Sequence, residues 1–411
     1  MKIQDKLQNL LILCIFPPFF SMIYFLKKFY ENPKKNSLLL AISLSSIFCL
    51  IIPMYDIIHF YNSYIFIKTL SLREFFFINK TFYHCIYWLG SVFLEYWHIY
   101  FIIISFILFV WNSIFIEMIN LKNSCYKYFF IIFLFSIYPR EILDLTRYFL
   151  AIIVYLYFMV KFFKNRNTIF LFAIFISFFI HHSLIIFIIL FYVSVFLEKF
   201  NPKLVNIVFI SFILIGIRIF EKKILIFTAF SLRKISNPLS ERITNYTINN
   251  NKLLNILKES RAESFKFFWI ILILIILGFF ILYLLSKKYI LVSFLDYLLL
   301  ETLILNFFFI DKYVLNERIY IFFVILLIIW IIAKPIVNKK YLKIFGIIIF
   351  LNTSFFTLYY IPAFYVKENV THLSNVKTAK LEIYKSFYVP TFLTVFRTKY
   401  SDSWIEKWRV K

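Results

Sequence analysis

The sequence predicts an all-α, polytopic integral membrane protein with about twelve transmembrane segments, within a range of roughly ten to fourteen. Of its 411 residues, 62% are hydrophobic and only 16% are charged, whereas a soluble domain needs roughly 25% charged residues to cover its surface. Apolar runs long enough to cross a hydrocarbon core of about 30 Å recur along the whole chain. The four glycines stand apart from one another, which excludes a glycine-rich phosphate loop and a GxxxG packing motif.

Apolar segments make up the predicted membrane domain, residues 1–361, and a polar C-terminal tail follows at 362–411. The segments are about 7–26, 37–55, 98–119, 126–138, 145–163, 168–181, 183–198, 204–219, 267–285, 290–309, 318–336 and 341–361. Pro17 and Pro18 lie inside the first segment and predict a kink, because neither has an N–H to donate. This segment lacks the small-residue cleavage site of a signal peptide, so we expect it to remain as the first span.

Lysine and arginine residues gather in short loops between the apolar segments and bring the net charge to +24. The clusters lie at 27–35, 161–166, 287–288 and 334–343. The positive-inside rule places such loops in the cytoplasm, where anionic lipid headgroups are better partners for this charge than nucleic acid. All four clusters reach the cytoplasm only if 168–198 forms two short helices that turn near the outer face at His181-His182. Both chain termini are then expected outside.

Three longer hydrophilic regions are expected at the outer face, namely 56–96, 220–266 and the C-terminal tail. The 220–266 loop carries nine Lys or Arg residues and four Glu residues. A basic outer loop departs from the usual bias and indicates an anionic partner, with Arg242 as one contact; alternatively, a long loop escapes the charge rule. The four cysteines show neither metal-ligand spacing nor a disulfide framework, and no metal or cofactor is expected.

A cationic helix face is predicted just before the second basic cluster. A helix can begin at Tyr138-Pro139, since proline suits the first helical turn. Arg140, Asp144 and Arg147 then fall at i, i+4 and i+7 and share one face. Arg147 lies about 25 Å along the helix from Lys164, at the outer edge of the hydrocarbon. An ionisable group at that depth marks a functional site by default; the alternatives are an Arg147–Asp144 pair or snorkelling.

His181 is expected at the same depth as Arg147, because it lies roughly 21 Å along the next helix from Asn167. It stands in F-F-I-H-H-S, at the predicted break between two short helices. Backbone groups left free by such a break are tolerated only beside protein or water. A histidine there can serve as a general base or as a hydrogen-bond donor. The alternative is a packed interfacial histidine, and His182 is the weaker candidate of the two.

Other ionisable residues are predicted at the outer level. Arg318 opens the eleventh segment and lies about 24 Å from Lys334, unless it pairs with Glu317 or Asp311. Asp56, His59 and Tyr61 follow the second segment, where they would bind sugar hydroxyls or deprotonate one; an ordinary polar loop is the alternative.

Two acidic residues lie inside the tenth segment. Asp296 and Glu301 stand at i and i+5, a poor spacing for a shared site, so each is expected to pair with a neighbouring helix.

Cations that converge beside the outer leaflet suit one class of ligand. Arginine forks bind phosphate oxygens in a bidentate manner. A polyprenyl diphosphate has its charged group at that depth and its tail in lipid. Diphosphate is also a leaving group in glycosyl transfer, and arginine would stabilise the charge that develops on it in the absence of a visible metal-ligand cluster.

These residues resemble the pattern of the EpsG-type family of exopolysaccharide polymerases, which is related to Wzy-type O-antigen polymerases. The resemblance covers about residues 50–335 and depends on Y-D-I-I-H-F-Y, T-R-Y-F-L-A, H-H-S and N-E-R-I. Arg147, Ala151, His181, Ser183 and Arg318 match the family pattern in order and spacing. His59-Phe60-Tyr61 stands where such families often have Arg-Tyr-Tyr, so a cationic role at position 59 does not carry over.

The resemblance implies a membrane glycosyltransferase that polymerises undecaprenyl-diphosphate-linked oligosaccharide repeat units at the outer face of a bacterial inner membrane. Arg147 and Arg318 would bind the diphosphate, and His181 or Asp56 would deprotonate the acceptor hydroxyl. Arg140, Asp144, His59, Tyr61 and Arg242 are further candidate contacts to sugar or acceptor. Expected partners are the lipid-linked oligosaccharide, membrane lipids, a separate flippase and a chain-length regulator.

Three other functions fit the same layout. A flippase of lipid-linked oligosaccharide would use the basic cavity without chemistry, although the matched halves typical of transporters are not visible. An outer-face ligase or acyltransferase would share the general arrangement. A purely structural membrane subunit would have less need of intramembrane His and Arg residues.

Overall fold

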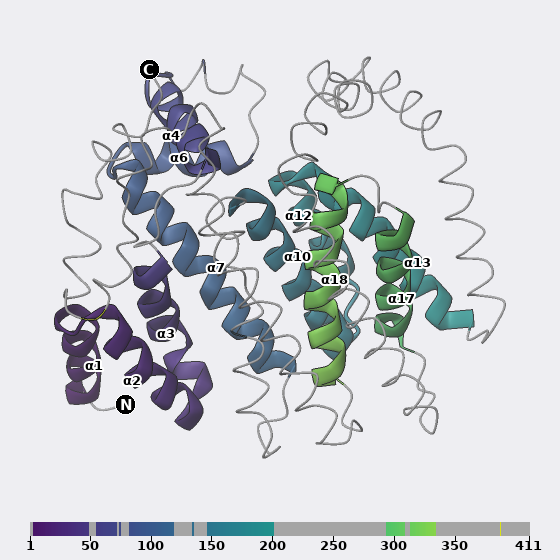
Figure 1. Cartoon of the computed structure of the whole chain (residues 1–411), viewed down its shortest axis with the longest axis horizontal. Helices are drawn as coiled ribbons and strands as arrows, with labels where there is room; N and C mark the ends of the chain where they lie inside the picture. The colour runs from purple at the N-terminus through teal and green to yellow at the C-terminus, as the bar shows by residue number, and fades with distance from the viewer. Residues whose placement is uncertain are drawn as a thin grey trace, which may run out of the picture. The chain divides into compact units, whose positions relative to one another are not determined.

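The computed structural model describes residues 3–48, 55–71, 74, 82–118, 134, 146–200, 293–308, 313–333 and 387 (Figure 1). Every regular element in this part of the chain is a helix, as the sequence predicts. The chain divides into two compact units, Met1–Ile186 with Phe350–Lys411, here called unit 1, and Phe187–Ile349, called unit 2. Each unit is described by itself.

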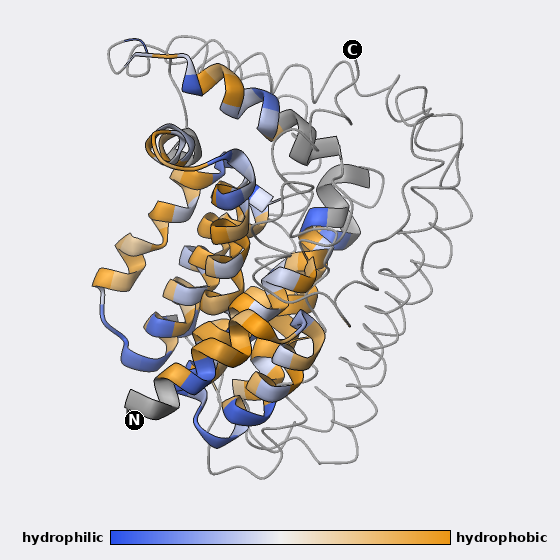
Figure 2. Cartoon of the chain, turned by 90° about the vertical axis from the view of Figure 1, so that its left-hand side faces the viewer, coloured by the Kyte–Doolittle hydropathy of each residue, from blue (hydrophilic) through white to orange (hydrophobic). Residues whose placement is uncertain are grey.

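Within the residues that the structure describes, three segments are long and apolar enough to cross a membrane. They are α7 (Tyr96–Met118), α10 (Thr146–Asn165), and His182–Lys199, which joins a short 3₁₀ turn to α13 (Ile185–Phe200). They correspond to the predicted segments 98–119, 145–163 and 183–198. Figure 2 shows that the helix bodies are apolar and that hydrophilic residues gather near helix ends. The predicted segments 204–219, 267–285 and 341–361, and 126–138 apart from Leu134, lie outside the described residues.

The first predicted segment, 7–26, is a helical hairpin and not one kinked span. Pro17 is extended, with φ −57° and ψ 146°, between α1 (Ile3–Ile15) and α2 (Pro18–Glu31). The Ser21 hydroxyl donates to the Ile12 carbonyl oxygen at 3.1 Å, and the Tyr24 hydroxyl donates to Asn9 Oδ1 at 3.3 Å. Residues fifteen positions apart meet only if the chain folds back on itself. The two consecutive prolines therefore break the helix where a kink was expected.

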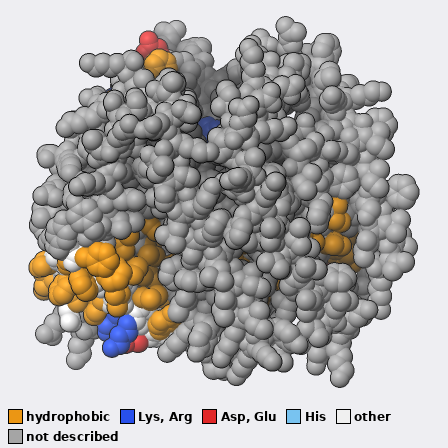
Figure 3. Space-filling view, viewed as in Figure 1, with side chains coloured by type: hydrophobic (Ala, Val, Ile, Leu, Met, Phe, Trp, Pro, Cys, Tyr) orange, Lys and Arg blue, Asp and Glu red, His pale blue; other side chains and the backbone are white. Residues whose placement is uncertain are grey.

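The hairpin leaves one apolar face uncovered by the rest of the chain. Leu10, Leu11, Ile15, Phe16 and Phe20 are all exposed. Figure 3 shows the corresponding hydrophobic side chains gathered over α1 and α2, with charged side chains at the lower edge of the patch. An apolar face of this kind suits lipid contact, whereas soluble proteins rarely expose one.

The corner between α2 and α3 (Pro33–Phe48) is closed by Asn36. Its Nδ2 donates to the carbonyl oxygens of Lys28 at 2.9 Å and Asn32 at 3.0 Å. The α3 helix then packs between α2 and α7. The hydroxyls of its buried serines donate hydrogen bonds to carbonyl oxygens of the same helix, as Ser43 does to Leu39 at 2.9 Å. These small side chains therefore pack at the interface with their hydroxyls hydrogen-bonded.

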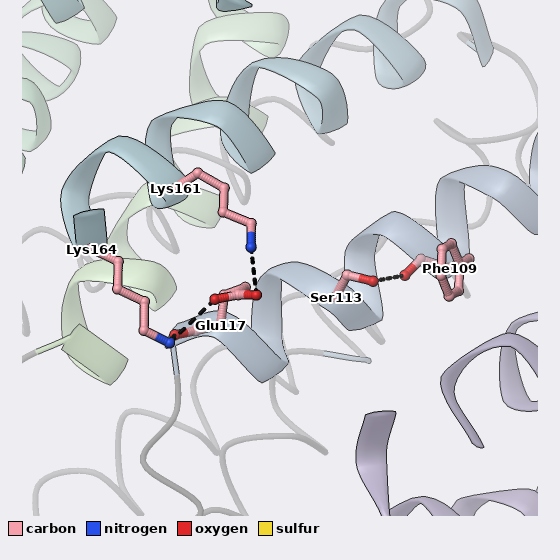
Figure 4. Close-up of polar contacts among 5 residues, drawn as sticks. All are labelled: Phe109, Ser113, Glu117, Lys161 and Lys164. Atoms are coloured by element: carbon pink, nitrogen blue, oxygen red, sulfur yellow. Dashed lines mark hydrogen bonds and ion pairs between the residues drawn. The ribbon is translucent and has the colours of Figure 1, made fainter. Parts of the chain in front are cut away.

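Helices α7 and α10 pack side by side. Ion pairs join their C-terminal ends, which shows that the two helices run in the same direction (Figure 4). Glu117 of α7 accepts from Lys161 Nζ at 2.7 Å and from Lys164 Nζ at 3.2 Å, both of α10. Asn112 of α7 donates to the Ser37 carbonyl oxygen at 3.1 Å, which brings the α2–α3 corner to the same end.

This end of unit 1, which carries clusters 27–35 and 161–166, is called the basic end. The two clusters share one side, in agreement with the predicted topology. The hairpin of α1 and α2 also returns the start of α1 toward the basic end. The expectation that the N-terminus lies opposite to these clusters is therefore wrong.

A layer of two shorter helices covers the other end of unit 1. Helices α4 (Tyr55–Lys68) and α6 (Phe82–Ser91) pack on each other, and α6 packs on α7. Much of the predicted outer-face loop 56–96 is thus helical. The Tyr96 ring, at the start of α7, lies at centroid distances of 5.5 Å from Tyr61, 5.6 Å from Tyr64 and 5.5 Å from Tyr87. This end is called the tyrosine end.

Gly90 sets the approach of α6 to α7. A Cβ atom at this position would lie 2.6 Å from Ile99 Cδ1 and 2.9 Å from Ile99 Cγ1, closer than van der Waals contact allows. Ile99 is buried, so it has little room to move aside. A Cβ atom at position 90 would therefore force the Ile99 side chain to shift within the contact between these two helices.

Unit 2 is described through α13, α17 (Phe294–Phe308) and α18 (Tyr313–Ala333). Aromatic contacts join them: the rings of Phe187 and Phe322 lie 4.0 Å apart, and those of Phe191 and Phe294 lie 5.4 Å apart. The two acidic residues of α17 each bond to a neighbouring helix, as the sequence predicts. The Ser194 hydroxyl donates to Glu301 Oε2 at 3.0 Å, and Trp330 Nε1 donates to Asp296 Oδ1.

Candidate functional site

The candidate site lies where the chain returns along α10 after passing the basic end. Arg166 adopts a left-handed conformation with φ 53°, and its N–H bonds to the Phe162 carbonyl oxygen at 2.8 Å. A residue in this conformation ends an α-helix and redirects the chain. Helices α11 (Ile169–Ala173) and α12 (Phe175–Ile180) then pack against α10 and run back toward its first turn.

His181 ends α12, as the predicted helix break requires. It has an extended backbone, with φ −148° and ψ 113°, while its N–H still bonds to the Ser177 carbonyl oxygen at 3.0 Å. A 3₁₀ turn, η1 (His182–Leu184), follows directly and leads into α13. The histidine is therefore fixed at both sides, by the last turn of α12 and by the turn that follows.

His181 lies beside the first turn of α10. The centroid of its ring is 5.2 Å from that of Tyr148, and the two planes meet at 73°. Tyr148 is almost completely buried and is the direct neighbour of Arg147, whose side chain is partly buried. The structure thus places His181 beside the residue that follows Arg147, at the start of α10.

The imidazole of His181 is held by Ser183, two residues on. The backbone N–H of Ser183 donates to Nδ1 at 3.3 Å, and Oγ of Ser183 lies 2.7 Å from the same nitrogen. A backbone N–H can only donate, so Nδ1 acts as the acceptor and has no proton of its own. The neutral ring then carries its hydrogen on Nε2. His181 has the form of a hydrogen-bond donor at Nε2 in this arrangement.

His182 has a different environment. Its ring lies 5.0 Å from that of Phe178, which is on the preceding turn. This contact fits a histidine that packs against an aromatic neighbour, and it agrees with the choice of His181 as the stronger candidate.

The site belongs to the tyrosine end of unit 1. Helix α12 contacts α6 as well as α10, so His181 and the first turn of α10 lie on the side of α4 and α6. Asp56 and His59 belong to α4, and their side chains lie outside the described residues. Tyr61 is only 1% exposed and packs against Tyr64 and Tyr96, so the structure does not present it to a sugar.

The remaining predicted residues lie outside the described part of unit 1. Arg318 is partly buried at the second turn of α18, in unit 2. Arg140, Asp144 and Arg242 lie outside the described residues. Among the described residues, no group of three or more His, Cys, Asp or Glu side chains is placed to hold a metal ion.

The structure adds two residues to the site that the sequence analysis did not name as site residues: Tyr148, which contacts the His181 ring, and Ser183, which hydrogen-bonds to it. Tyr148 stands in T-R-Y-F-L-A and Ser183 in H-H-S, so both lie within the segments that carry the family resemblance. Their roles depend on ring contact and on the geometry of a turn, which residue order does not specify.

Comparison with known proteins finds no match: no protein family, curated protein or solved structure corresponds to this chain. The resemblance to polysaccharide polymerases therefore stays a prediction, and the site is interpreted from its own residues.

Proposed function

We propose that this protein polymerises polyprenyl-diphosphate-linked oligosaccharide repeat units, as a multi-pass glycosyltransferase at the outer face of a bacterial inner membrane. The observation that carries the proposal is the contact between Tyr148 and His181. It supports a site made of the first turn of α10, with Arg147, and the end of α12. A cation and an imidazole at one helix end are suited to a diphosphate and to proton transfer beside it.

The position of this site in unit 1 supports an outer-face location. The basic end carries Lys161 and Lys164, and the positive-inside rule assigns such an end to the cytoplasm. The first turn of α10 is at the other end of a helix of 20 residues, about 30 Å away. A substrate diphosphate that has been translocated lies at this depth, while its polyprenyl tail remains in the lipid.

In the proposed reaction, the acceptor hydroxyl of one lipid-linked unit attacks the anomeric carbon of the growing chain. The bond between that carbon and the phosphate oxygen breaks, and the polyprenyl diphosphate leaves with the electron pair. Arg147 would stabilise the charge that appears on the leaving group, with Arg318 as a second cation. The acceptor proton passes to a base, for which the sequence offers His181 and Asp56.

The direct test is reconstitution of the purified protein in liposomes with a lipid-linked repeat unit. We expect glycans of increasing length and release of polyprenyl diphosphate in a one-to-one ratio with bonds formed. The same liposomes with Arg147→Ala serve as the matched control. Repeat units that remain single while the wild-type protein is folded would refute the proposal.

One observation favours a second candidate function. The distance of 2.7 Å between Ser183 Oγ and His181 Nδ1 is within the range of an activated serine nucleophile and its base. An outer-face acyltransferase would use Ser183 in this way and form an acyl-enzyme. A serine-directed fluorophosphonate probe separates the two candidates, since labelling that Ser183→Ala abolishes is expected only of the acyltransferase.

A further inference from the structure

We propose that Ser183 is a positioning residue that holds His181 as its Nε2–H tautomer, and that His181 therefore acts as a hydrogen-bond donor and not as the general base. This inference rests on the proposed glycosyl transfer for its mechanistic meaning. The tautomer itself can be measured without any substrate.

Nδ1 of His181 is a hydrogen-bond acceptor. Both the N–H of Ser183 and its hydroxyl approach this nitrogen, at 3.3 Å and 2.7 Å. The hydroxyl can rotate to donate or accept, but the backbone N–H has no such choice. Both bonds form together only when Nδ1 offers a lone pair, so they select the ring that carries its hydrogen on Nε2.

This arrangement is built into the backbone. His181 is extended and Ser183 lies in the 3₁₀ turn that follows, so the side chain of His181 caps the N–H two residues ahead. Side-chain caps of this kind are local and do not depend on distant parts of the fold. The edge-type contact with the Tyr148 ring restrains the plane of the imidazole as well.

The consequence concerns which group takes the proton. A general base needs a lone pair directed at the acceptor hydroxyl, and the lone pair of His181 is already used at Nδ1. Its Nε2–H can donate to a phosphate oxygen of the leaving group, which adds to the charge stabilisation by Arg147. The acceptor proton must then go to a different base, and a carboxylate such as Asp56 of α4 has the right chemistry.

The experiment is nitrogen NMR of the protein in lipid nanodiscs with ¹⁵N-labelled histidine. His181 is assigned by the signals that disappear in His181→Gln. Protonated and unprotonated ring nitrogens have well-separated shifts, and one-bond coupling to hydrogen identifies which nitrogen carries the proton. We expect Nε2–H in the wild-type protein, in Ser183→Thr and in Ser183→Ala, because all three keep the backbone N–H that selects the tautomer.

Ser177→Ala is the matched control, because Ser177 is a buried serine of α12, the helix that His181 ends, and its hydroxyl bonds to the Ile174 carbonyl oxygen at 2.6 Å. It should leave the His181 tautomer unchanged. A ring protonated at Nδ1 in the wild-type protein, or in Ser183→Ala, would overturn the proposal.

Activity then tests the role of the donor. The amide of glutamine can donate a hydrogen bond but cannot act as a base, so His181→Gln should retain more polymerisation than His181→Ala, which should lose about ten- to a hundredfold. Equal and complete loss in both variants would instead support a base. If the tautomer is as expected but no variant polymerises, the proposed function fails while the tautomer assignment stands.

Discussion

The rings of Tyr148 and His181 form an edge-type contact, with centroids 5.2 Å apart and planes that meet at 73°. The two residues are 33 positions apart in sequence and belong to helices that run in opposite directions. Their contact joins the start of α10 to the end of α12. Because Arg147 directly precedes Tyr148 in the chain, this contact also keeps the backbone of Arg147 close to His181 at one end of unit 1.

The first prediction tests this contact. Tyr148→Phe keeps the ring and should retain near-wild-type activity, whereas Tyr148→Leu removes the aromatic edge, worth about 0.5–1.5 kcal/mol, and should lower polymerisation several-fold. The measurement is polymer yield at equal amounts of folded protein. Tyr155→Leu is the control, since it removes another fully buried ring from α10, about two turns further along. An equal loss of activity in the control would mean that packing of α10 alone is responsible.

Activity should depend on the shape of the charged group at position 147 as well as on its charge. Arg147→Lys keeps the charge but loses the bidentate fork, so we expect roughly a tenfold or larger fall in activity with unchanged protein level. Arg166→Lys makes the same change at an exposed residue of the basic end and should be silent. Normal polymer from Arg147→Ala would remove this residue from the mechanism.

The topology of the chain gives a prediction that is independent of function. Reporter tags at Lys34, Arg166 and Lys340 should report the cytoplasm, and a tag near Asn249 should report the outside, according to the basic clusters. Because α1 and α2 form a hairpin, we expect an N-terminal tag in the cytoplasm too. A cytoplasmic reading at Asn249 would contradict the proposed placement of the site at the outer face.

Sequence reasoning predicted the helix break at His181 because a count of basic loops demanded it. It also predicted that Arg147 and His181 lie at similar heights, since the rise of a helix is constant, and the contact between Tyr148 and His181 is consistent with this. It could not predict that Pro17 reverses the chain, because a proline pair is compatible with a kink or a break, and hydrogen bonds such as that between Tyr24 and Asn9 decide between them. The burial of Tyr61 was missed for a similar reason, since an amphipathic tyrosine suits a sugar site and a tyrosine cluster equally well.

The packing of α6 on α7 predicts a specific pair of variants. Gly90→Ala places a Cβ atom 2.6 Å from Ile99 Cδ1 and should destabilise the protein by about 1–3 kcal/mol. Ile99→Ala removes the clashing atoms, so the double variant should be more stable than the sum of the two single changes predicts. Thermal unfolding in detergent measures both effects. Additive losses would show that the two residues do not meet.

The last prediction separates a polymerase from a flippase. A polymerase acts after translocation and needs its charged groups at the outer face, where Arg147 and His181 lie if the basic end is cytoplasmic. A flippase must expose its site to each side in turn and would favour charged groups near the middle of the membrane. Loss of a polymerase should therefore leave single lipid-linked units on the outer face, and loss of a flippase should leave them on the cytoplasmic face.

The measurement is extraction of lipid-linked oligosaccharide from a deletion strain, after an impermeant glycosidase has been added to spheroplasts. We expect single repeat units that the enzyme digests, together with loss of long polymer. A strain with Arg318→Ala should show the same phenotype if Arg318 binds the diphosphate, and Arg166→Lys should restore the wild-type pattern when supplied to the deletion strain. Single units that remain protected from the glycosidase would rule out the polymerase, because a site at the outer face cannot account for substrate held on the other side.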